Sequence, residues 1–227
     1  MTIDRHFRGP TRSANGGYTC GVLASLLHGP AEVTLRLPPP LERPLEVDWE
    51  DGRRRIELRD GDALVAEAEP AEVDLDLPDP IPFEDAAAAA LPEGDKESAF
   101  PECFVCGWAR DDGLGIYAGP VPDSELVAAT WTPRPDHVAP EFVWAALDCP
   151  GAYAVHGGER GMPVLGRLAA RVEHLPHPRE RCVVLGWPLG EEGRKLYAGT
   201  ALFGEDGRVL GAGRATWIAP GASTKSK

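Results

Sequence analysis

The sequence lacks a long apolar segment. Its longest apolar run, near residues 86–91, is far shorter than the roughly 20 residues that span a bilayer. Residues 1–8 are charged where a signal peptide needs an apolar core. The five cysteines, an odd number, do not suggest a disulfide framework and fit a reducing compartment. We therefore expect a cytoplasmic protein without a membrane partner.

Basic residues are scarce relative to acidic ones. The chain has 23 Lys and Arg against 36 Asp and Glu, which gives a net charge of −13. Proteins that bind nucleic acid by neutralising phosphates are normally basic, so we expect no nucleic-acid partner. A phosphorylated small molecule is not excluded, because a local cluster of cations is enough to bind it.

Several glycine motifs of common enzymes are also absent. The chain has no Gly-x-Ser-x-Gly nucleophile elbow and no Gly-Lys-Ser/Thr phosphate loop. The pairs Gly113-x-Gly115 and Gly211-x-Gly213 lack the third glycine of the dinucleotide fingerprint. A serine hydrolase, a P-loop enzyme and a Rossmann dehydrogenase are therefore disfavoured.

Hydrophobic periodicity and turn signals predict two similar halves, each with a helix and a run of strands. In the first half we expect a helix over residues 17–27 and strands over 32–37, 45–49, 53–58 and 64–68. In the second half we expect a strand over 126–131, a helix over 141–147 and strands over 167–173, 182–187, 195–203 and 209–218. Strands without βαβ alternation predict an α+β fold.

The two halves look like a diverged internal duplication. The segment DGDALVA at residues 60–66 parallels DGRVLGA at 206–212. We expect an N-terminal repeat over residues 1–78 and a C-terminal repeat over 101–220. Between them, residues 79–100 form a linker with a short Ala-rich helix over 85–91, and residues 221–227 form a disordered tail.

The pair Cys103-x-x-Cys106 has the spacing of a zinc knuckle, but no second pair of ligands follows it. Cys149, Cys182, His137 and His156 complete a metal site only if folding brings them together. A redox pair lacks a thioredoxin-like context. We favour a structural turn with buried thiols and expect no bound metal.

The segment Cys103-Phe-Val-Cys-Gly, followed by Asp-Gly-Leu-Gly-Ile at 112–116, resembles the start of hotdog-fold thioesterases of the phenylacetate-pathway type. In that family a His-Gly-Gly helix start precedes an acidic residue nine positions after the His. Here Asp148 takes the place of the catalytic carboxylate, while Ala139-Pro140-Glu141 replaces His-Gly-Gly.

The first half is similar to the Gly-Gly helix start of double-hotdog acyl-CoA thioesterases, through Asn15-Gly16-Gly17, with Ala24 at the carboxylate position. Leu147-Asp148 matches the Leu-Asp of the acyl-CoA thioesterase II type. The resemblance covers nearly all of residues 7–218. It implies a double hotdog, in which each repeat is a central helix wrapped by an antiparallel β-sheet.

The resemblance implies hydrolysis of an acyl-CoA or related acyl-thioester at one composite site between the repeats. Asp148 is the expected general base, and the backbone N–H groups of Gly16 and Gly17 are the expected oxyanion donors. Coenzyme A enters as part of the substrate and no other cofactor is expected. The candidate substrate-binding residues are Asn15, Tyr18, Trp144 and Arg194.

Two departures from the family keep alternatives open. Ala215 or Thr216 replaces a Gln that supports the attacking water, and Pro150 interrupts a helix that normally continues. A non-catalytic acyl-thioester or lipid-binding protein and a hotdog dehydratase or hydratase are the alternatives. We also expect association into a homodimer or trimer.

The candidate site residues also have purely structural interpretations. Asn15 is a common helix N-cap, the two glycines allow close helix packing, and Asp148 before Cys-Pro fits a turn. The two aromatic candidates suit a core, and Arg194 suits a solvated strand face. The structure has to decide between these interpretations.

Overall fold

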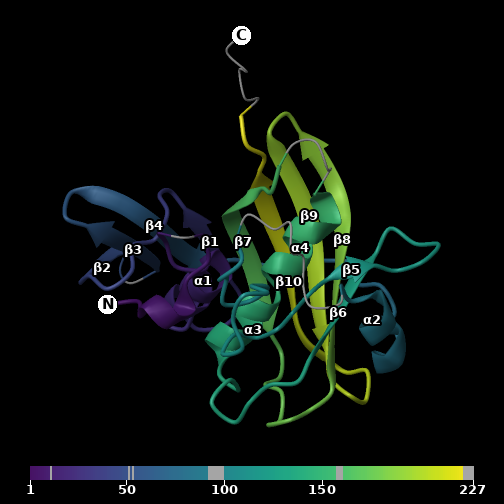
Figure 1. The fold of residues 1–227 in the computed structure, drawn as a ribbon. Helices are drawn as coiled ribbons and strands as arrows, with labels where there is room; N and C mark the ends of the chain where they lie inside the picture. Colours follow the sequence, from purple (N-terminus) through teal and green to yellow (C-terminus); the bar gives the residue numbers. More distant parts are fainter. Residues whose placement is uncertain (11, 51, 53, 92–99, 157–160, 222–227) are drawn as a thin grey trace.

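The computed structural model describes residues 1–10, 12–50, 52, 54–91, 100–156 and 161–221. Its main element is a ten-stranded sheet in which every neighbouring pair of strands is antiparallel (Figure 1). The strand order is β2-β3-β4-β1-β7-β10-β9-β8-β6-β5. The first half supplies β1 (Ala31–Leu35), β2 (Glu46–Glu50), β3 (Arg55–Asp60) and β4 (Ala63–Pro70). The second half supplies β5 (Gly119–Pro120), β6 (Val127–Trp131), β7 (Val164–Val172), β8 (Cys182–Glu192), β9 (Lys195–Phe203) and β10 (Val209–Ile218).

One strand pair joins the two halves into a single sheet. β1 lies antiparallel to β7, with Ala31 opposite Ala170 and Val33 opposite Leu168. All four side chains are buried, so the junction lies within the hydrophobic core. Sheet hydrogen bonds and shared apolar packing therefore hold the halves together.

In β3, as in other strands of the first half, apolar residues alternate with polar ones, whereas β8 and β9 are buried over continuous runs. In β3, Ile56 and Leu58 are fully buried while Glu57 between them is only half-buried. Alternating side chains point to opposite faces of a strand, so this pattern presents one apolar face to the helices.

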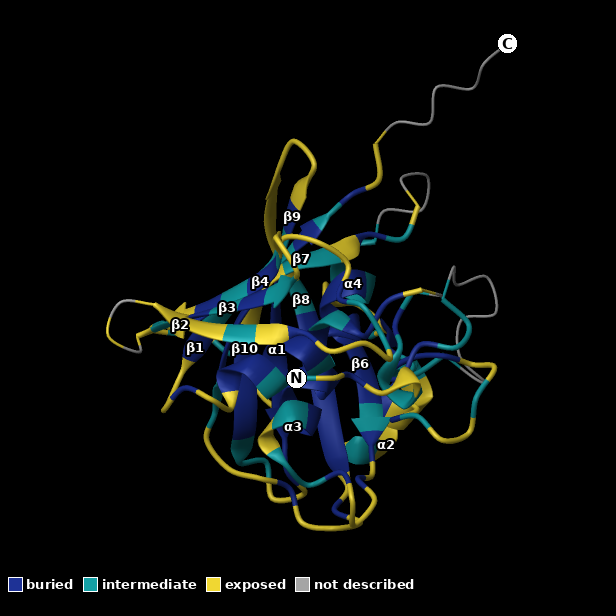
Figure 2. Cartoon of the chain, turned by 90° about the vertical axis from the view of Figure 1, so that its left-hand side faces the viewer, coloured by how far each residue is buried: buried dark blue, intermediate teal, exposed yellow. Residues whose placement is uncertain are grey.

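Helices α1 (Gly16–Ala24) and α3 (Pro140–Ala146) pack against each other and carry most of the buried helical residues (Figure 2). Gly17 and Gly21 permit this contact, since a Cβ on Gly21 would lie 2.6 Å from the Cα of Glu141. The other helices are the 3₁₀ turn η1 (Arg5–Phe7), α2 (Phe83–Ala89) and α4 (Cys149–Val155).

Most expected elements are present, and β9 and β10 have the expected bounds. The first helix ends at Ala24 instead of residue 27, and the Ala-rich helix begins at Phe83 instead of residue 85. The short strand β5 and the helix α4 were not predicted. Residues 92–99 of the expected linker and 222–227 of the expected tail lie outside the described residues, and the repeat boundaries stay a prediction.

Within the described parts of the chain, none of the helices has the length and apolar character needed to cross a lipid bilayer.

Candidate functional site

Asp148 lies at a break between α3 and α4. Leu147 ends α3 in a helical conformation, but Asp148 has ψ of −81° and interrupts the helix. Pro150 then occupies the first turn of α4, where a missing N–H costs nothing. The sequence analysis expected Pro150 to interrupt a helix, whereas the structure has the break at Asp148 and places Pro150 inside the new helix that begins at Cys149.

The Asp148 side chain contacts the start of α1 instead of capping its own helix. It makes no capping hydrogen bond to α4. Its Oδ2 accepts hydrogen bonds from Asn15 Nδ2 at 2.8 Å and from the Gly17 N–H at 3.0 Å. Asp148 is 3% exposed, and its Oδ1 has no hydrogen-bond partner among the described residues. This arrangement contradicts the interpretation of Asp148 as a capping residue.

Burial raises the pKa of Asp148 to about 7, because a desolvated carboxylate is disfavoured. The hydrogen bonds from the Gly17 N–H and Asn15 act in the opposite direction and lower the pKa. A carboxyl group whose pKa lies near neutrality is suited to exchange a proton with a bound molecule.

Asn15 has two roles that the sequence analysis treated as alternatives. Its Oδ1 accepts a hydrogen bond from the Tyr18 N–H at 2.8 Å and so caps α1. Its Nδ2 donates to Asp148 across the interface of the two helices. The N-cap interpretation is therefore confirmed, while the role of Asn15 in substrate binding stays a prediction.

The two glycines after Asn15 differ in what they do. A Cβ on Gly17 would lie 2.5 Å from the Asp148 Cβ, so only glycine allows this close approach. The sequence analysis expected the Gly17 N–H to be an oxyanion donor, but in this structure it already donates to Asp148. Gly16 lines a cavity, and its N–H has no partner among the described residues.

This cavity has a volume of about 530 Å³ and is lined by both halves of the chain. The first half contributes the start of α1, including Asn15 and Gly16, and the end of β1. The second half contributes the α3–α4 junction with Asp148, the start of β7 and the end of β10. Most of the lining is apolar, so the buried carboxylate is next to a space suited to an apolar ligand.

Two arginines mark the opening of the cavity. Arg12 and Arg36 are both exposed and line the cavity, together with the exposed side chains of Leu37 and Val164. Arg36 is paired with Glu67 on β4, whereas Arg12 has no ion pair among the described residues. Neither arginine was among the predicted site residues, because nothing in the local sequence indicates that both lie at one opening.

Trp217 is a further residue that the sequence analysis missed. It lies near the end of β10, lines the cavity, and its buried indole N–H has no partner among the described residues. A buried donor without a partner is unusual, and this indole nitrogen lies close to Gly151 in α4.

Three of the expected substrate-binding residues do not line the cavity, so their role in binding stays a prediction without support from this site. Tyr18 stacks on Phe7 with ring centroids 3.9 Å apart. Trp144 is buried in α3 against Gly21. Arg194 donates from Nε to the carbonyl of Ala219 at 3.0 Å. Core packing and local hydrogen bonding account for all three.

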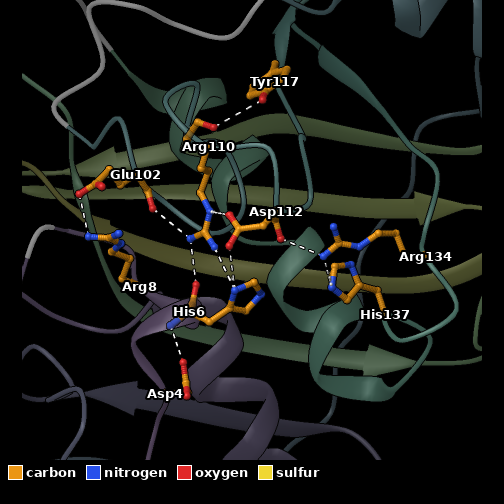
Figure 3. Close-up of polar contacts among 10 residues, drawn as sticks. Asp4, His6, Arg8, Glu102, Arg110, Asp112, Tyr117, Arg134 and His137 are labelled. Atoms are coloured by element: carbon orange, nitrogen blue, oxygen red, sulfur yellow. Dashed lines mark hydrogen bonds and ion pairs between the residues drawn. The ribbon is translucent and has the colours of Figure 1, made fainter.

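The segment that carries Cys103 and Cys106 is fixed to the N-terminal residues by a polar network (Figure 3). Arg110 donates to Asp112 at 2.6 Å and to the carbonyl of His6 at 2.9 Å. Arg8 pairs with Glu102 at 2.7 Å, directly before the first cysteine. These contacts hold the cysteine turn beside the start of α1.

Cys103 and Cys106 meet a third thiol in the cavity wall. The Sγ of Cys149, the first residue of α4, lies 3.8 Å from that of Cys103, and the three sulfur atoms lie within 4.8 Å of one another. Asn15 Nδ2 lies 3.8 Å from the Cys103 sulfur. The sequence analysis required folding to bring a further ligand to this pair, and the structure does so with Cys149.

The sequence matches no protein-family model and no curated protein. Solved structures are similar over almost the whole chain. A protein from Novosphingobium aromaticivorans, provisionally described as a thioesterase, is 14% identical, with a TM-score of 0.63 over 97% of this chain and 94% of that chain. A TesB protein from Mycobacterium avium subs paratuberculosis is 16% identical, with a TM-score of 0.58 over 92% of this chain and 88% of that chain.

A conserved protein of unknown function with a hot dog fold, from Alicyclobacillus acidocaldarius, is 12% identical, with a TM-score of 0.59 over 96% of this chain and 91% of that chain. At such identities the likeness establishes the fold. The chain has a hotdog fold, as its resemblance to hotdog thioesterases predicts.

Proposed function

We propose that the protein hydrolyses an acyl-CoA or related acyl-thioester at the cavity between its two halves. The observation that supports this most directly is the buried Asp148 carboxylate in the cavity wall. Asn15 and Gly17 orient Oδ2, while Oδ1 has no partner among the described residues. A fixed carboxylate with one unengaged oxygen can bind a water molecule and accept its proton.

In this proposal the chain is a double hotdog in which each half is a diverged repeat. The single ten-stranded sheet joined by β1 and β7, and the packing of α1 against α3, support it. The site is then composite, with the helix start from the first repeat and the carboxylate from the second.

Hydrolysis also needs donors for the oxyanion that forms when water attacks the thioester carbonyl. Because the Gly17 N–H donates to Asp148, we assign this role to the Gly16 N–H and the Trp217 indole N–H. Both residues line the cavity and neither N–H has a partner among the described residues. The Gly17 N–H then acts by holding the base.

The attacking water must be held without the Gln of related thioesterases. Ala215 and Thr216, which stand in its place, do not line the cavity. We therefore assign both the binding and the deprotonation of the water to Asp148. At the opening, Arg12 and Arg36 provide positive charge for the phosphates of coenzyme A, and the apolar lining accommodates the acyl chain.

The test is release of free thiol from a panel of acyl-CoA substrates of increasing chain length, followed with a thiol reagent. The proposal predicts saturable turnover with at least one chain length. Saturable binding without turnover would instead support the non-catalytic acyl-thioester-binding alternative. A change in alkene absorbance without thiol release would support the dehydratase or hydratase alternative.

A further inference from the structure

We propose that Cys103, Cys106 and Cys149 bind one zinc ion whose fourth coordination position is open to the cavity. Nothing in the proposed hydrolysis uses these thiols, so the inference does not rest on that function. It replaces the expectation from the sequence that the cysteine pair is a metal-free turn.

The distances between the sulfur atoms fit a zinc site. Tetrahedral zinc with Zn–S bonds of about 2.3 Å places its sulfur ligands about 3.8 Å apart. The Sγ atoms of Cys103 and Cys149 are 3.8 Å apart, and all three sulfurs lie within 4.8 Å of one another. A small adjustment of side chains is enough to bring them around one ion.

The backbone around the first two cysteines has the form of a metal-binding knuckle. The Asn15 side-chain amide donates a hydrogen bond to the Cys103 sulfur, with Nδ2 and Sγ 3.8 Å apart. The Gly107 N–H donates to the Cys103 carbonyl at 2.8 Å, and a Cβ on Gly107 would lie 2.5 Å from two backbone atoms of Cys103. N–H donors around a sulfur stabilise the thiolate form that a metal requires.

The third ligand comes from a distant part of the chain and is held rigidly. Cys149 belongs to α4, while the knuckle is fixed by the polar network around Arg110 (Figure 3). A site whose ligands are held before the metal arrives loses little conformational freedom on binding. Three soft sulfur ligands favour zinc over magnesium or calcium.

The fourth position is assigned to the cavity because all three cysteines line it. Within the described residues, no His, Asp, Glu or further Cys belongs to the same cluster. Three protein ligands with an open position is the arrangement of zinc sites that exchange a bound ligand. Water or a small thiol from the cavity is the expected fourth ligand.

The test uses the full chain, reduced, stripped of metal with a chelator and titrated with cobalt(II) as a spectroscopic substitute for zinc. We expect sulfur-to-cobalt charge-transfer absorption and intense tetrahedral visible bands that saturate at one metal per chain, and their loss when zinc is added. Absence of charge-transfer absorption at excess cobalt, together with substoichiometric zinc in the purified protein, would overturn the proposal.

Single-cysteine substitutions test which thiols bind the metal. Cys106→Ser and Cys149→Ser should each lower zinc affinity at least about 10-fold, because even changes outside the ligand sphere often cost 10–100-fold. Cys182→Ser is the matched control, since Cys182 is also a buried free thiol but lies in β8 outside the cluster. An equal loss in the control would overturn the assignment. Because the cobalt titration uses the unchanged protein, it decides the proposal even if a variant fails to fold.

A separate measurement tests whether the fourth coordination position of the metal is open to the cavity. Adding β-mercaptoethanol, a small thiol, to the cobalt protein should shift the visible bands, because the fourth ligand exchanges. Unchanged bands would mean that the protein itself supplies the fourth ligand, which would contradict the open position. None of these measurements uses an acyl-thioester, so their failure is separate from failure of the proposed hydrolysis.

Discussion

The central helices of the two halves of the chain carry different functional groups. α1 begins at Gly16 and α3 at Pro140, an offset of 140 − 16 = 124 residues. The same offset places Ala24 opposite Asp148. The first helix has the capping Asn15 and two glycines without a carboxylate, and the second has the carboxylate behind a proline that has no N–H to donate.

This difference has a structural consequence at each helix. α1 continues through Ala24, which is buried and does not line the cavity. The second helix breaks at Asp148, and the break brings the carboxylate to the start of α1. Pairing the start of α1 with Asp148 unites donors and carboxylate, whereas the mirror pairing of Pro140 with Ala24 has neither. One half thus supplies the donors and the other half the carboxylate.

The largest expected effect on turnover comes from replacing the carboxylate of Asp148, which the first helix lacks. Asp148→Asn keeps the shape of the side chain, and its Oδ1 can still accept from Asn15 and Gly17, but it cannot accept a proton from water. Acyl-CoA turnover should fall at least about 10²-fold while acyl-thioester binding stays nearly unchanged. Steady-state thiol release and calorimetric binding measure the two quantities, and turnover at the parental rate would show that the mechanism is wrong.

The next effect concerns the close contact between the halves. Gly17→Ala places a methyl group 2.5 Å from the Asp148 Cβ and 2.8 Å from the Trp144 carbonyl, so neighbouring atoms must move. Overpacking of this kind costs about 1–3 kcal/mol of unfolding free energy and should also lower turnover by displacing Asp148. Chemical denaturation measures the first effect.

Gly221→Ala is the control for this substitution, because a Cβ at Gly221 meets no described atom within 4 Å. Its unfolding free energy should change by less than about 0.5 kcal/mol. Equal stability of the two variants would mean that the helices are not as close as the structure has them.

A smaller effect separates the two roles of Asn15. Asn15→Ser keeps an oxygen that can cap α1 but loses the amide that donates to Asp148, whereas Asn15→Ala loses both. The serine variant should be more stable than the alanine variant by about 1 kcal/mol, the usual value of an N-cap. Both should show a similar loss of turnover, and a serine variant as active as the parent would remove Asn15 from the site.

The comparison also shows which features could be predicted from the sequence. Most strands were predicted well, because apolar residues that alternate with polar ones, such as Ile56 and Leu58, can be read directly from the sequence. The candidate carboxylate and helix start were found through motifs. By contrast, aromatic and basic side chains such as Tyr18 and Arg194 have no local signal that separates cavity lining from packing, and neither of these two lines the cavity.

Features formed by distant segments were the hardest to predict. The helix α4 was missed because Pro150 was taken as the end of a helix, although proline is equally suited to the first turn of the next one. The proximity of Cys149 to Cys103 depends on tertiary packing, and so does the burial of the Trp217 N–H without a partner among the residues that the structure describes. No local pattern in the sequence encodes either.

The central claim is that the chain has one composite site. The most direct test is the stoichiometry with which the protein binds a non-hydrolysable acyl-CoA thioether, measured by isothermal titration calorimetry on the parent protein and on Asp148→Asn. The account predicts one ligand per chain in both cases. Two ligands per chain would show that the mirror pairing of Pro140 with Ala24 also forms a site, and would contradict the account.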